Sequence, residues 1–302
     1  MIDKRALGVG VFMYTPAILN GVEEKLDKWC DLDSICLDFE DGLAERDLAM
    51  AERGIAPLLE RIQVKNDRGI NVFIRVRNPS QFKTIAPIIP KELVTGYVFP
   101  KVTTSNFLRY YETYAKYAAA ESGFIPILET EEIADTGTRF SELIGLYRQF
   151  KEVETHLICL QFGAADLCRI YRLRRPLGFT VYDIQVLVSI IADILSIFLR
   201  DFAITGSVYE YFTGDFAETL RKETMLDRLN GFTGKLAIHP NQLPIIKEAL
   251  QIPADELAEA KQLVESDLSV EKSLSGRMNE RNTHLGWAEK LLALHDALSG
   301  RK

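Results

Sequence analysis

Residues 35–47 read ICLDFEDGLAERD, and this stretch decides the fold of the 302-residue chain. A short apolar run ends in alternating acids, Asp38, Glu40 and Asp41, and a glycine and a helix-like segment follow. This pattern predicts a buried strand that carries carboxylates at its carboxyl end. If the chain is an α/β barrel, that end of the strand is where its chemistry lies.

Apolar runs of the same kind alternate with helix-like segments along most of the chain, which is the pattern of βα units and a parallel sheet. The runs are nearly continuous, as expected for strands covered on both faces. The predicted strands are residues 7–14, 34–39, 71–76, 96–99, 124–128, 155–162, 202–205 and 235–238. The predicted helices are residues 21–30, 47–67, 105–122, 139–151, 182–198, 215–230, 254–265 and 285–298, and residues 266–281 are predicted to form a loop.

Eight strands in about 240 residues predict an α/β fold, a (β/α)8 TIM barrel with a C-terminal helical extension. We expect the barrel over residues 1–250 and the extension over residues 251–302, and no Gly/Ser-rich linker cuts the chain into two separate domains. A doubly wound open sheet is the alternative. Its Gly-rich phosphate loop is missing after the first strand, where the sequence is YTPAILNG.

Composition excludes several classes of function. The net charge of −7 and pI near 5.3 argue against binding to nucleic acid or to an anionic membrane surface. The longest apolar segment, residues 184–199, contains Gln185 and Asp193 and falls short of the ~20 residues that span a bilayer. No signal peptide and no CxxC pair is apparent, so we expect a cytoplasmic protein with reduced cysteines.

The run that contains Arg172, Arg174 and Arg175 allows two interpretations. The three side chains could hold a small anion, or they could form a solvated, charged turn. A charged turn is the more common outcome for such a run, and we favour it here.

Charged side chains follow the predicted strands at positions that converge on one mouth of a barrel. Carboxylates after strands two, five and six form an oxygen-rich site suited to Mg²⁺ or Mn²⁺, whereas zinc is disfavoured because only one histidine lies there. An arginine on strand three would face a substrate carboxylate. The residues concerned are Glu40, Asp41, Arg75, Arg77, Asn78, Lys101, Glu129, Gly163, Asp166 and His239.

Each of these residues also has an ordinary explanation. Glu129 could be a solvated acid, Asp166 could cap a helix, and Lys101 could lie on the surface. Glu40 and Asp41 could pair with Arg46 or Arg53, and His239 could be structural. The joint pattern favours a functional site, because packing gives a barrel no reason to collect so many charges at one mouth.

The sequence at these positions resembles that of the citrate lyase beta-subunit-like proteins of the HpcH/HpaI aldolase superfamily. The matching segments, in order along the chain, are LDFEDGL, FIRVRNP, FPKV, ILET, QFGAAD and GFTGKLAIHPNQ. The resemblance implies that Glu129 and Asp166 bind Mg²⁺, for which Mn²⁺ could substitute. It also implies that Arg75 binds the substrate carboxylate and that Glu40 and Asp41 orient metal-bound water and the arginine. Lys101, Gly163 and Ala164 would complete the substrate site, and His239 would support the mouth.

The C-terminal segment GRMNERNTHLGWAEKLL matches the family more loosely. In CoA-dependent members an aspartate of this segment reaches the active site of a neighbouring subunit, and Glu280 stands at its position. The resemblance therefore implies a homo-oligomer, a trimer, with Glu280 as the acid or base. A metal-bound water is the alternative proton carrier.

These observations predict a Mg²⁺-dependent carbon–carbon lyase or aldolase acting on a hydroxy or keto acid that bears a carboxylate, or on its CoA thioester of the citramalyl-, malyl- or citryl-CoA type. Glu131 and Glu132 depart from the family pattern and would repel the phosphates of CoA. An aldolase that uses pyruvate or oxaloacetate without CoA is therefore the alternative. A non-catalytic, ligand-binding barrel within a larger assembly is the alternative from another class.

Overall fold

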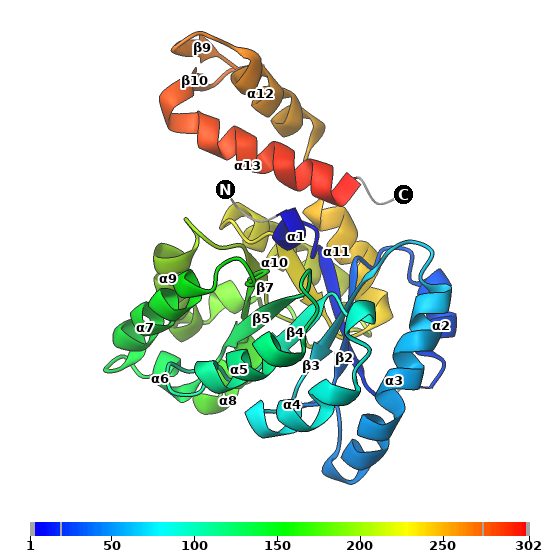
Figure 1. Cartoon of the computed structure of the whole chain (residues 1–302). Helices are drawn as coiled ribbons and strands as arrows, with labels where there is room; N and C mark the ends of the chain where they lie inside the picture. The colour runs from blue at the N-terminus through cyan, green and yellow to red at the C-terminus, as the bar shows by residue number, and fades with distance from the viewer. Residues whose placement is uncertain (1–3, 19, 274, 300–302) are drawn as a thin grey trace.

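The computed structural model describes residues 4–18, 20–273 and 275–299. Eight parallel strands pair in chain order and close into a barrel, and helices surround it (Figure 1). The predicted (β/α)8 fold is thereby confirmed. The barrel strands are β1 (Val11–Pro16), β2 (Ser34–Asp38), β3 (Asn71–Arg75), β4 (Gly96–Phe99), β5 (Gly123–Leu128), β6 (Leu160–Phe162), β7 (Ile204–Gly206) and β8 (Gly234–Ala237).

The α-helices cover the outside of the barrel and form most of the extension. The helices up to β6 are α1 (Lys4–Leu7), α2 (Val22–Lys25), α3 (Leu48–Lys65), α4 (Pro79–Ile85), α5 (Phe107–Tyr117), α6 (Glu131–Ala134) and α7 (Arg139–Glu152). The later ones are α8 (Ala164–Ile170), α9 (Gln185–Phe198), α10 (Ala217–Leu229), α11 (Leu243–Leu250), α12 (Ala254–Glu265) and α13 (Arg281–Ser299).

Strand periodicity determines which side chains enter the barrel. Successive residues of a strand face opposite sides, so residues two apart share a side. Cys36 of β2 and Phe73 of β3 belong to the apolar core inside the barrel. Asp38 and Arg75, two residues further along these strands, therefore face the same interior at its carboxyl end, where they are partners in the β2–β3 register.

The first strand begins later than the sequence predicts. The apolar pattern predicts an extended segment over residues 7–14, but Lys4–Leu7 forms α1 and β1 starts at Val11. Gly10 between them has φ = 55°, a left-handed conformation that interrupts an extended chain. Ala6 and Val9 are buried in the interior core, so this segment closes the amino end of the barrel.

Other differences concern the length of elements. The sixth strand covers Leu160–Phe162 instead of residues 155–162, with one isolated bridge from Phe124 to Leu157 before it. The expected helix 21–30 is reduced to α2 and a 3-10 turn at Leu26–Lys28. Residues 266–281 are not simply a loop, because β9 (Val270–Lys272) and β10 (Met278–Glu280) form an antiparallel hairpin there, although Leu274 lies outside the described residues.

A network of buried charges joins the barrel wall to α10. Lys235 of β8 donates to Glu223 at 2.7 Å and to Asp227 at 2.6 Å. Arg175 pairs with the same Glu223, and its Nε donates to Glu210 at 2.9 Å. We call these five residues the wall network. The expectation of a solvated turn is wrong for Arg175, which is 2% exposed because two acids pair with it.

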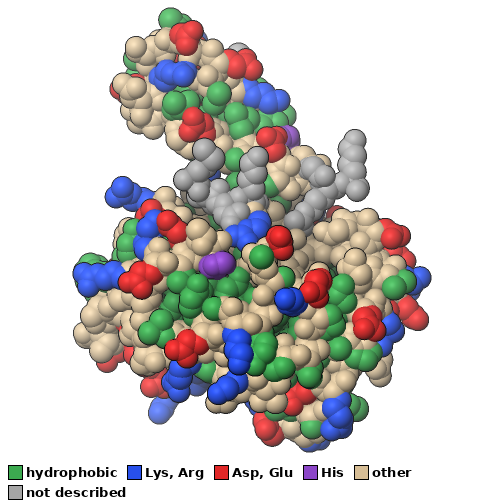
Figure 2. Space-filling model, in the orientation of Figure 1, with side chains coloured by type: hydrophobic (Ala, Val, Ile, Leu, Met, Phe, Trp, Pro, Cys, Tyr) green, Lys and Arg blue, Asp and Glu red, His purple; other side chains and the backbone are tan. Residues whose placement is uncertain are grey.

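The extension, made of α12, α13 and the β9–β10 hairpin, stands on the amino end of the barrel (Figure 1). There α13 contacts α1, and Lys290 of α13 donates to the carbonyl of Gly231 just before β8. Figure 2 shows the extension as a separate lobe, with positive and negative side chains interspersed over the visible face. Within the described ranges, none of the helices is long and apolar enough to cross a membrane.

Candidate active site

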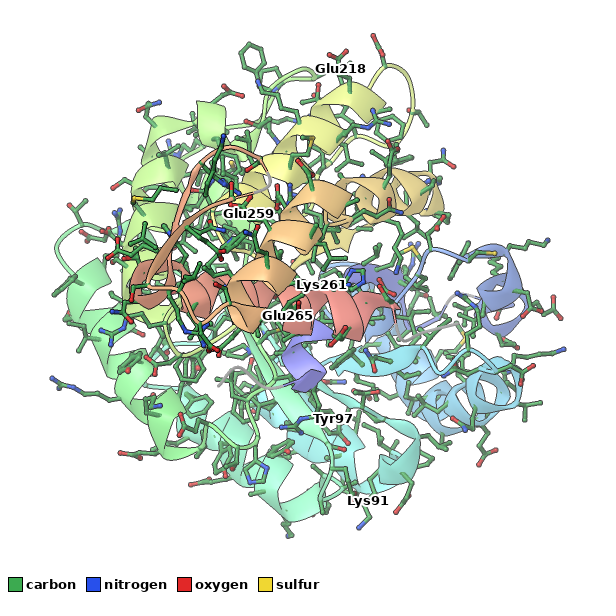
Figure 3. All side chains as sticks on the ribbon, turned by 90° about the horizontal axis from the view of Figure 1, so that it is seen from above. Lys91, Tyr97, Glu218, Glu259, Lys261 and Glu265 are labelled. Carbon is green, nitrogen blue, oxygen red and sulfur yellow. The ribbon has the colours of Figure 1, made fainter. Side chains whose placement is uncertain are left out.

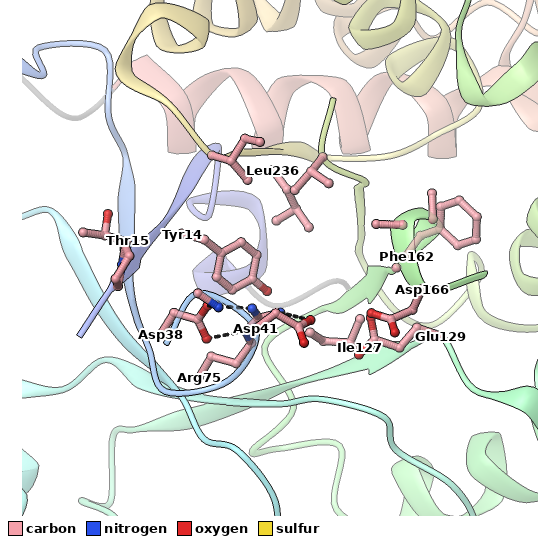
Figure 4. Close-up of a pocket in the computed structure, with 17 residues that line it drawn as sticks. Tyr14, Thr15, Asp38, Asp41, Arg75, Ile127, Glu129, Phe162, Asp166 and Leu236 are labelled. Atoms are coloured by element: carbon pink, nitrogen blue, oxygen red, sulfur yellow. Dashed lines mark hydrogen bonds and ion pairs between the residues drawn. The ribbon is translucent and has the colours of Figure 1, made fainter. Parts of the chain in front are cut away.

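A cavity of about 340 Å³ opens at the carboxyl end of the barrel (Figure 4). Its size suits a small acid better than a macromolecule. Polar side chains at the carboxyl ends of β1, β2, β3 and β5 and in the first turn of α8 form one part of its lining: Tyr14, Asp38, Asp41, Arg75, Glu129 and Asp166. Apolar side chains of β6, β8 and the segments after β7 and β8 form another: Phe162, Val208, Leu236 and Ile238. Gly163 and Ala164, directly after β6, also line the cavity.

Arg75 is fixed at the wall of this cavity. Its Nε and one terminal nitrogen donate to the two carboxylate oxygens of Asp38, both at 2.6 Å. Its other terminal nitrogen, NH1, lies 3.2 Å from Glu40 and 3.9 Å from Asp41. Burial lowers the pKa of Arg75, but the charge and hydrogen bonds of Asp38 outweigh it and raise that pKa well above its usual value. Asp38 thus takes the two donors of Arg75 with which we expected it to bind a substrate carboxylate, and only NH1 remains to contact a substrate.

Lys101 connects the acids of three loops. Its ammonium pairs with Glu40 and lies 3.7 Å from Asp41 and 3.9 Å from Asp166. Its backbone has φ = 51°, which is uncommon for a residue with a Cβ and is typical of functional sites. That conformation also directs its N–H onto Oε1 of Glu129 at 3.0 Å. The ordinary explanations, a surface Lys101 and acids paired with Arg46 or Arg53, do not describe this cluster.

Burial controls the protonation of the acids here. It raises the pKa of Glu40 to about 7, against the lowering effect of Arg75. It also raises the pKa of Glu129 to about 8, and the charge of Asp166 adds to that effect. For Asp41 burial acts in the same direction, but the hydrogen bond from Glu40 and the charges of Lys101 and Arg75 outweigh it and lower the pKa.

Glu129 and Asp166 lie next to each other on the cavity wall, as Figure 4 shows. Glu129 follows Ile127 by two residues on the interior side of β5 and its next turn, and it is 4% exposed. Gly163 makes room for it, because a Cβ there would stand 2.2 Å from Glu129 Oε2. Asp166 lies in the first turn of α8 but makes no cap hydrogen bond, and it accepts from Arg169 at 2.9 Å instead. Its role is therefore not that of a helix cap.

This pair could hold a divalent cation. Mg²⁺ prefers carboxylate and water oxygens, and a buried acid whose pKa is raised by a second acid is stabilised by an added cation. In the part of the chain that the structure describes, no group of three or more acids, histidines or cysteines is arranged to hold a metal alone. Glu129 and Asp166 fit an ion whose remaining ligands come from substrate and water.

Two further residues belong to the site and were missed by the sequence analysis. The ring of Tyr14 lies 4.4 Å from the guanidinium carbon of Arg75, and its hydroxyl bonds to Gln161. Strand periodicity could have found both, since Tyr14 follows the interior residue Phe12 by two positions and Gln161 follows Cys159 in the same way. Both lie below the charged mouth, where no acid or base in the sequence drew attention to them.

Several predicted residues lie outside the cavity lining. Asn78 caps α4 by accepting from Gln81, and Arg77 pairs with Glu45 at 2.7 Å. His239 accepts from the N–H of Asn241 and stacks on Phe212, which places it at the turn after β8.

Glu280 is not brought to the site of its own chain. It ends β10 in the extension, where its N–H donates to His284. The extension stands on the amino end of the barrel, opposite the cavity (Figure 1). Glu280 could reach a cavity of this kind only in another copy of the chain.

Comparison with solved structures supports the fold. The CitE protein of Mycobacterium tuberculosis, in complex with magnesium, acetoacetate and coenzyme A, is 19% identical, with 96% of this chain and 99% of that chain covered and a TM-score of 0.63. A citrate lyase of Burkholderia xenovorans LB400 is 15% identical over 97% of this chain and 93% of that chain, with a TM-score of 0.74. RipC of Yersinia pestis is 17% identical over 83% and 99%, with a TM-score of 0.60.

No curated protein sequence matches the chain significantly. A family model does match it, over residues 3–298, and its description is a C–C bond lyase of the TIM-barrel fold. This match covers nearly the whole chain and agrees with the resemblance to citrate lyase beta-subunit-like proteins. The chain belongs to the C–C bond lyase family of the TIM-barrel fold.

Proposed function

We propose that the chain is a Mg²⁺-dependent lyase or aldolase that acts on a small hydroxy or keto acid, with Mn²⁺ as a substitute ion. The observation that carries this proposal is the pair of Glu129 and Asp166 on the cavity wall, where burial and Asp166 raise the pKa of Glu129 to about 8. Two solved relatives support it, since one is a complex with magnesium, acetoacetate and coenzyme A and another is a complex with oxaloacetate and magnesium.

When bound between these carboxylates, the ion would polarise a substrate carbonyl and stabilise negative charge on its oxygen. Lys101 keeps Glu129 in place through its backbone N–H, and its ammonium limits the repulsion between Glu40, Asp41 and Asp166. These contacts hold the acids in fixed positions before substrate enters, which lowers the cost of binding.

Arg75 would orient the carboxylate of the substrate through NH1, since Asp38 holds the other two donors. Asp41 also lines the cavity, and its lowered pKa keeps it ionised at neutral pH, so its charge could orient metal-bound water there. Glu280 would serve only from a neighbouring copy in a homo-oligomer, a trimer by resemblance. Gly163 and Ala164 would leave space for substrate.

The position of two acids supports a second candidate function, with a substrate that lacks CoA. Glu131 and Glu132 begin α6 directly after Glu129 and Thr130, and both are exposed. Their charge would repel the phosphates of a CoA thioester approaching from this side. A pyruvate- or oxaloacetate-type aldolase is therefore the second candidate beside citramalyl-, malyl- or citryl-CoA cleavage.

Metal binding and turnover test the proposal together. After treatment with EDTA, the protein is titrated calorimetrically with MnCl₂, and we expect one site that is lost in Glu129→Gln and Asp166→Asn. Glu132→Gln is the matched control, because it removes a nearby exposed acid outside the cavity lining.

Turnover is then measured with Mg²⁺ in two panels, pyruvate with aldehydes and acetyl-CoA with glyoxylate. We expect a metal-dependent product in one panel. If both acid variants bind Mn²⁺ like the original protein, the metal site is refuted. If metal binds but neither panel reacts, the proposed chemistry is refuted.

A further inference from the structure

A second cavity, of about 310 Å³, lies at the opposite end of the barrel from the active-site cavity. Arg228 and Phe232 line it from the end of α10 and the turn that follows. Trp287, Lys290 and Leu294 line it from α13. The cavity thus lies between the barrel and the extension, and no step of the proposed reaction uses it.

The charges around this cavity do not balance. Arg228 donates to Glu256 at 2.8 Å, and Arg277 donates to Glu259 at 2.8 Å. Lys290 has no acidic partner among the residues that the structure describes. Three cations therefore meet two acids, and the excess positive charge rests on Lys290.

The surroundings of Lys290 make this excess costly. Its ammonium donates to the carbonyl of Gly231 at 3.3 Å, a neutral acceptor that uses only one of three N–H groups. Burial in the cavity lowers the pKa of Lys290. A half-buried cation without a counter-charge is stabilised by an anion placed beside it.

The rest of the lining is apolar and partly open. Leu229 is 80% exposed and Trp287 is 37% exposed at the edge, whereas Phe232 and Leu294 are 3% and 8% exposed. Arg277 lies over the ring of Trp287, 5.7 Å from the ring centroid, and both side chains line the cavity. An anion that also carries an apolar body would match both kinds of lining.

We propose that this cavity binds an amphipathic monoanion, with its carboxylate or sulfonate against Lys290 and its apolar body along Trp287, Phe232 and Leu294. Such a ligand touches the barrel and the extension at once. Its binding would hold α12 and α13 against the amino end of the barrel, and Figure 3 shows these two helices lying across that end. The site requires no metal and is independent of the proposed lyase activity.

The probe is 8-anilinonaphthalene-1-sulfonate, an anion with an apolar body whose fluorescence rises in apolar sites. Titration of the whole protein should show one saturable site. Octanoate should displace the dye, and 1-octanol, which has the same chain without the charge, should displace it at least tenfold less well. The chain has two tryptophans, Trp29 and Trp287, so the loss of energy transfer to the bound dye in Trp287→Leu locates the site.

Lys290→Gln should weaken dye binding at least tenfold, and Lys290→Arg should restore most of it. Lys261→Gln is the matched control, because Lys261 is exposed on α12 and does not line the cavity (Figure 3). Circular dichroism checks that each variant folds. If Lys290→Gln does not fold, Trp287→Leu gives an independent test of the site.

Three results would overturn the proposal. One is the absence of saturable binding, or binding that Lys290→Gln leaves unchanged. Another is equal displacement by octanoate and octanol, which would mean that the charge has no role. The third is a lower molar mass of Lys290→Gln in light scattering, which would mean that a second copy of the chain covers this face.

Discussion

Two groups of buried charge lie in this barrel, and they are built in opposite ways. The wall network lies between β8, α10 and the loops beside them, with Lys235 and Glu223 fully buried. The mouth cluster opens onto the active-site cavity and consists of Asp38, Glu40, Asp41, Arg75, Lys101, Glu129 and Asp166. The first group stabilises the fold, whereas the second has the properties of a binding site for a cation and a small acid.

Charge balance separates the two groups. In the wall network, three acids meet two cations, and Lys235 and Arg175 each contact two acids. In the mouth cluster, five acids meet Arg75 and Lys101, and the exposed Arg169 adds only one more cation. Burial raises the pKa of Glu129 and Glu40, the neighbouring acids add to that effect, and the excess of acid beside a cavity favours a bound cation. The comparison predicts that mutations in the two groups change stability with opposite signs.

The largest effect is expected in the wall network. Lys235→Met leaves Glu223 and Asp227 buried with one cation fewer, and breaking such a pair costs about 3–5 kcal/mol. Urea unfolding should show this loss. Lys222→Met, on the exposed side of the same helix α10, is the control and should change the free energy of unfolding by less than about 0.5 kcal/mol. If Lys235→Met and the original protein had the same free energy of unfolding, the wall network would not stabilise the fold, and its distinction from the mouth cluster would be refuted.

The opposite sign is expected for Glu129→Gln in the metal-free protein. The folded state raises the pKa of Glu129 from 4.5 to about 8. The unfolded chain therefore loses this proton above pH 4.5, whereas the folded protein keeps it up to about pH 8. The contribution of Glu129 to the free energy of unfolding is highest below pH 4.5 and falls as the pH rises from 4.5 through 8. Glutamine removes this loss and keeps an oxygen that can accept from Lys101. We expect a gain of about 1–3 kcal/mol at pH 8 and almost none at pH 5.

Urea unfolding in EDTA at both pH values measures this gain. The variant should be more stable at pH 8 even though it no longer binds metal. A loss of stability at pH 8 would mean that Glu129 is a structural acid like those of the wall network.

Metal affinity should depend on pH through the same residue. A proton on Glu129 competes with the ion below pH 8, so the affinity for Mn²⁺ should rise about tenfold per pH unit between pH 6 and 8 and level off above. Calorimetry in buffers of different ionisation enthalpy should detect release of about one proton per ion at pH 6. An affinity that stays constant over this range would show that Glu129 is already ionised or does not bind the metal.

The mouth cluster was more predictable from sequence than the wall network. Strand ends of a parallel barrel converge whatever the details of packing, so Arg75, Lys101, Glu129 and Asp166 could be placed together once eight strands were counted. That Asp38 holds the fork of Arg75 follows only from the register of β2 and β3, which the sequence does not contain.

Lys235 illustrates the opposite case. It belongs to the segment GFTGKLAIHPNQ, which helped to reveal the family resemblance, but its neighbour Leu236 is the residue that lines the cavity. Lys235 itself faces α10 on the other side of the strand. A motif can therefore be specific to a family because of a buried structural pair as well as because of its active site. The β9–β10 hairpin was missed for another reason: four of its six strand residues are polar, and the two apolar ones, Val270 and Met278, are exposed, so the strands lack the apolar alternation that marks a half-buried strand.

The smallest effect is expected at Tyr14, which lies in the mouth cluster's surroundings but carries no charge. Tyr14→Phe removes the hydroxyl that bonds to Gln161 and keeps the ring beside Arg75. The amide nitrogen of Gln161 already has no hydrogen-bond partner in the part of the chain that is described, so the variant leaves its oxygen unpaired as well. A buried neutral acceptor left without its partner costs about 1–3 kcal/mol, less than a lost charge of the wall network. Affinity for Mn²⁺ should stay within about twofold, because the hydroxyl does not touch Glu129 or Asp166 and one neutral hydrogen bond is a small perturbation. If Tyr14→Phe instead abolished metal binding, the Tyr14 hydroxyl would couple the position of Arg75 to the metal site. Tyr14 and Gln161 would then have to be counted as members of the mouth cluster.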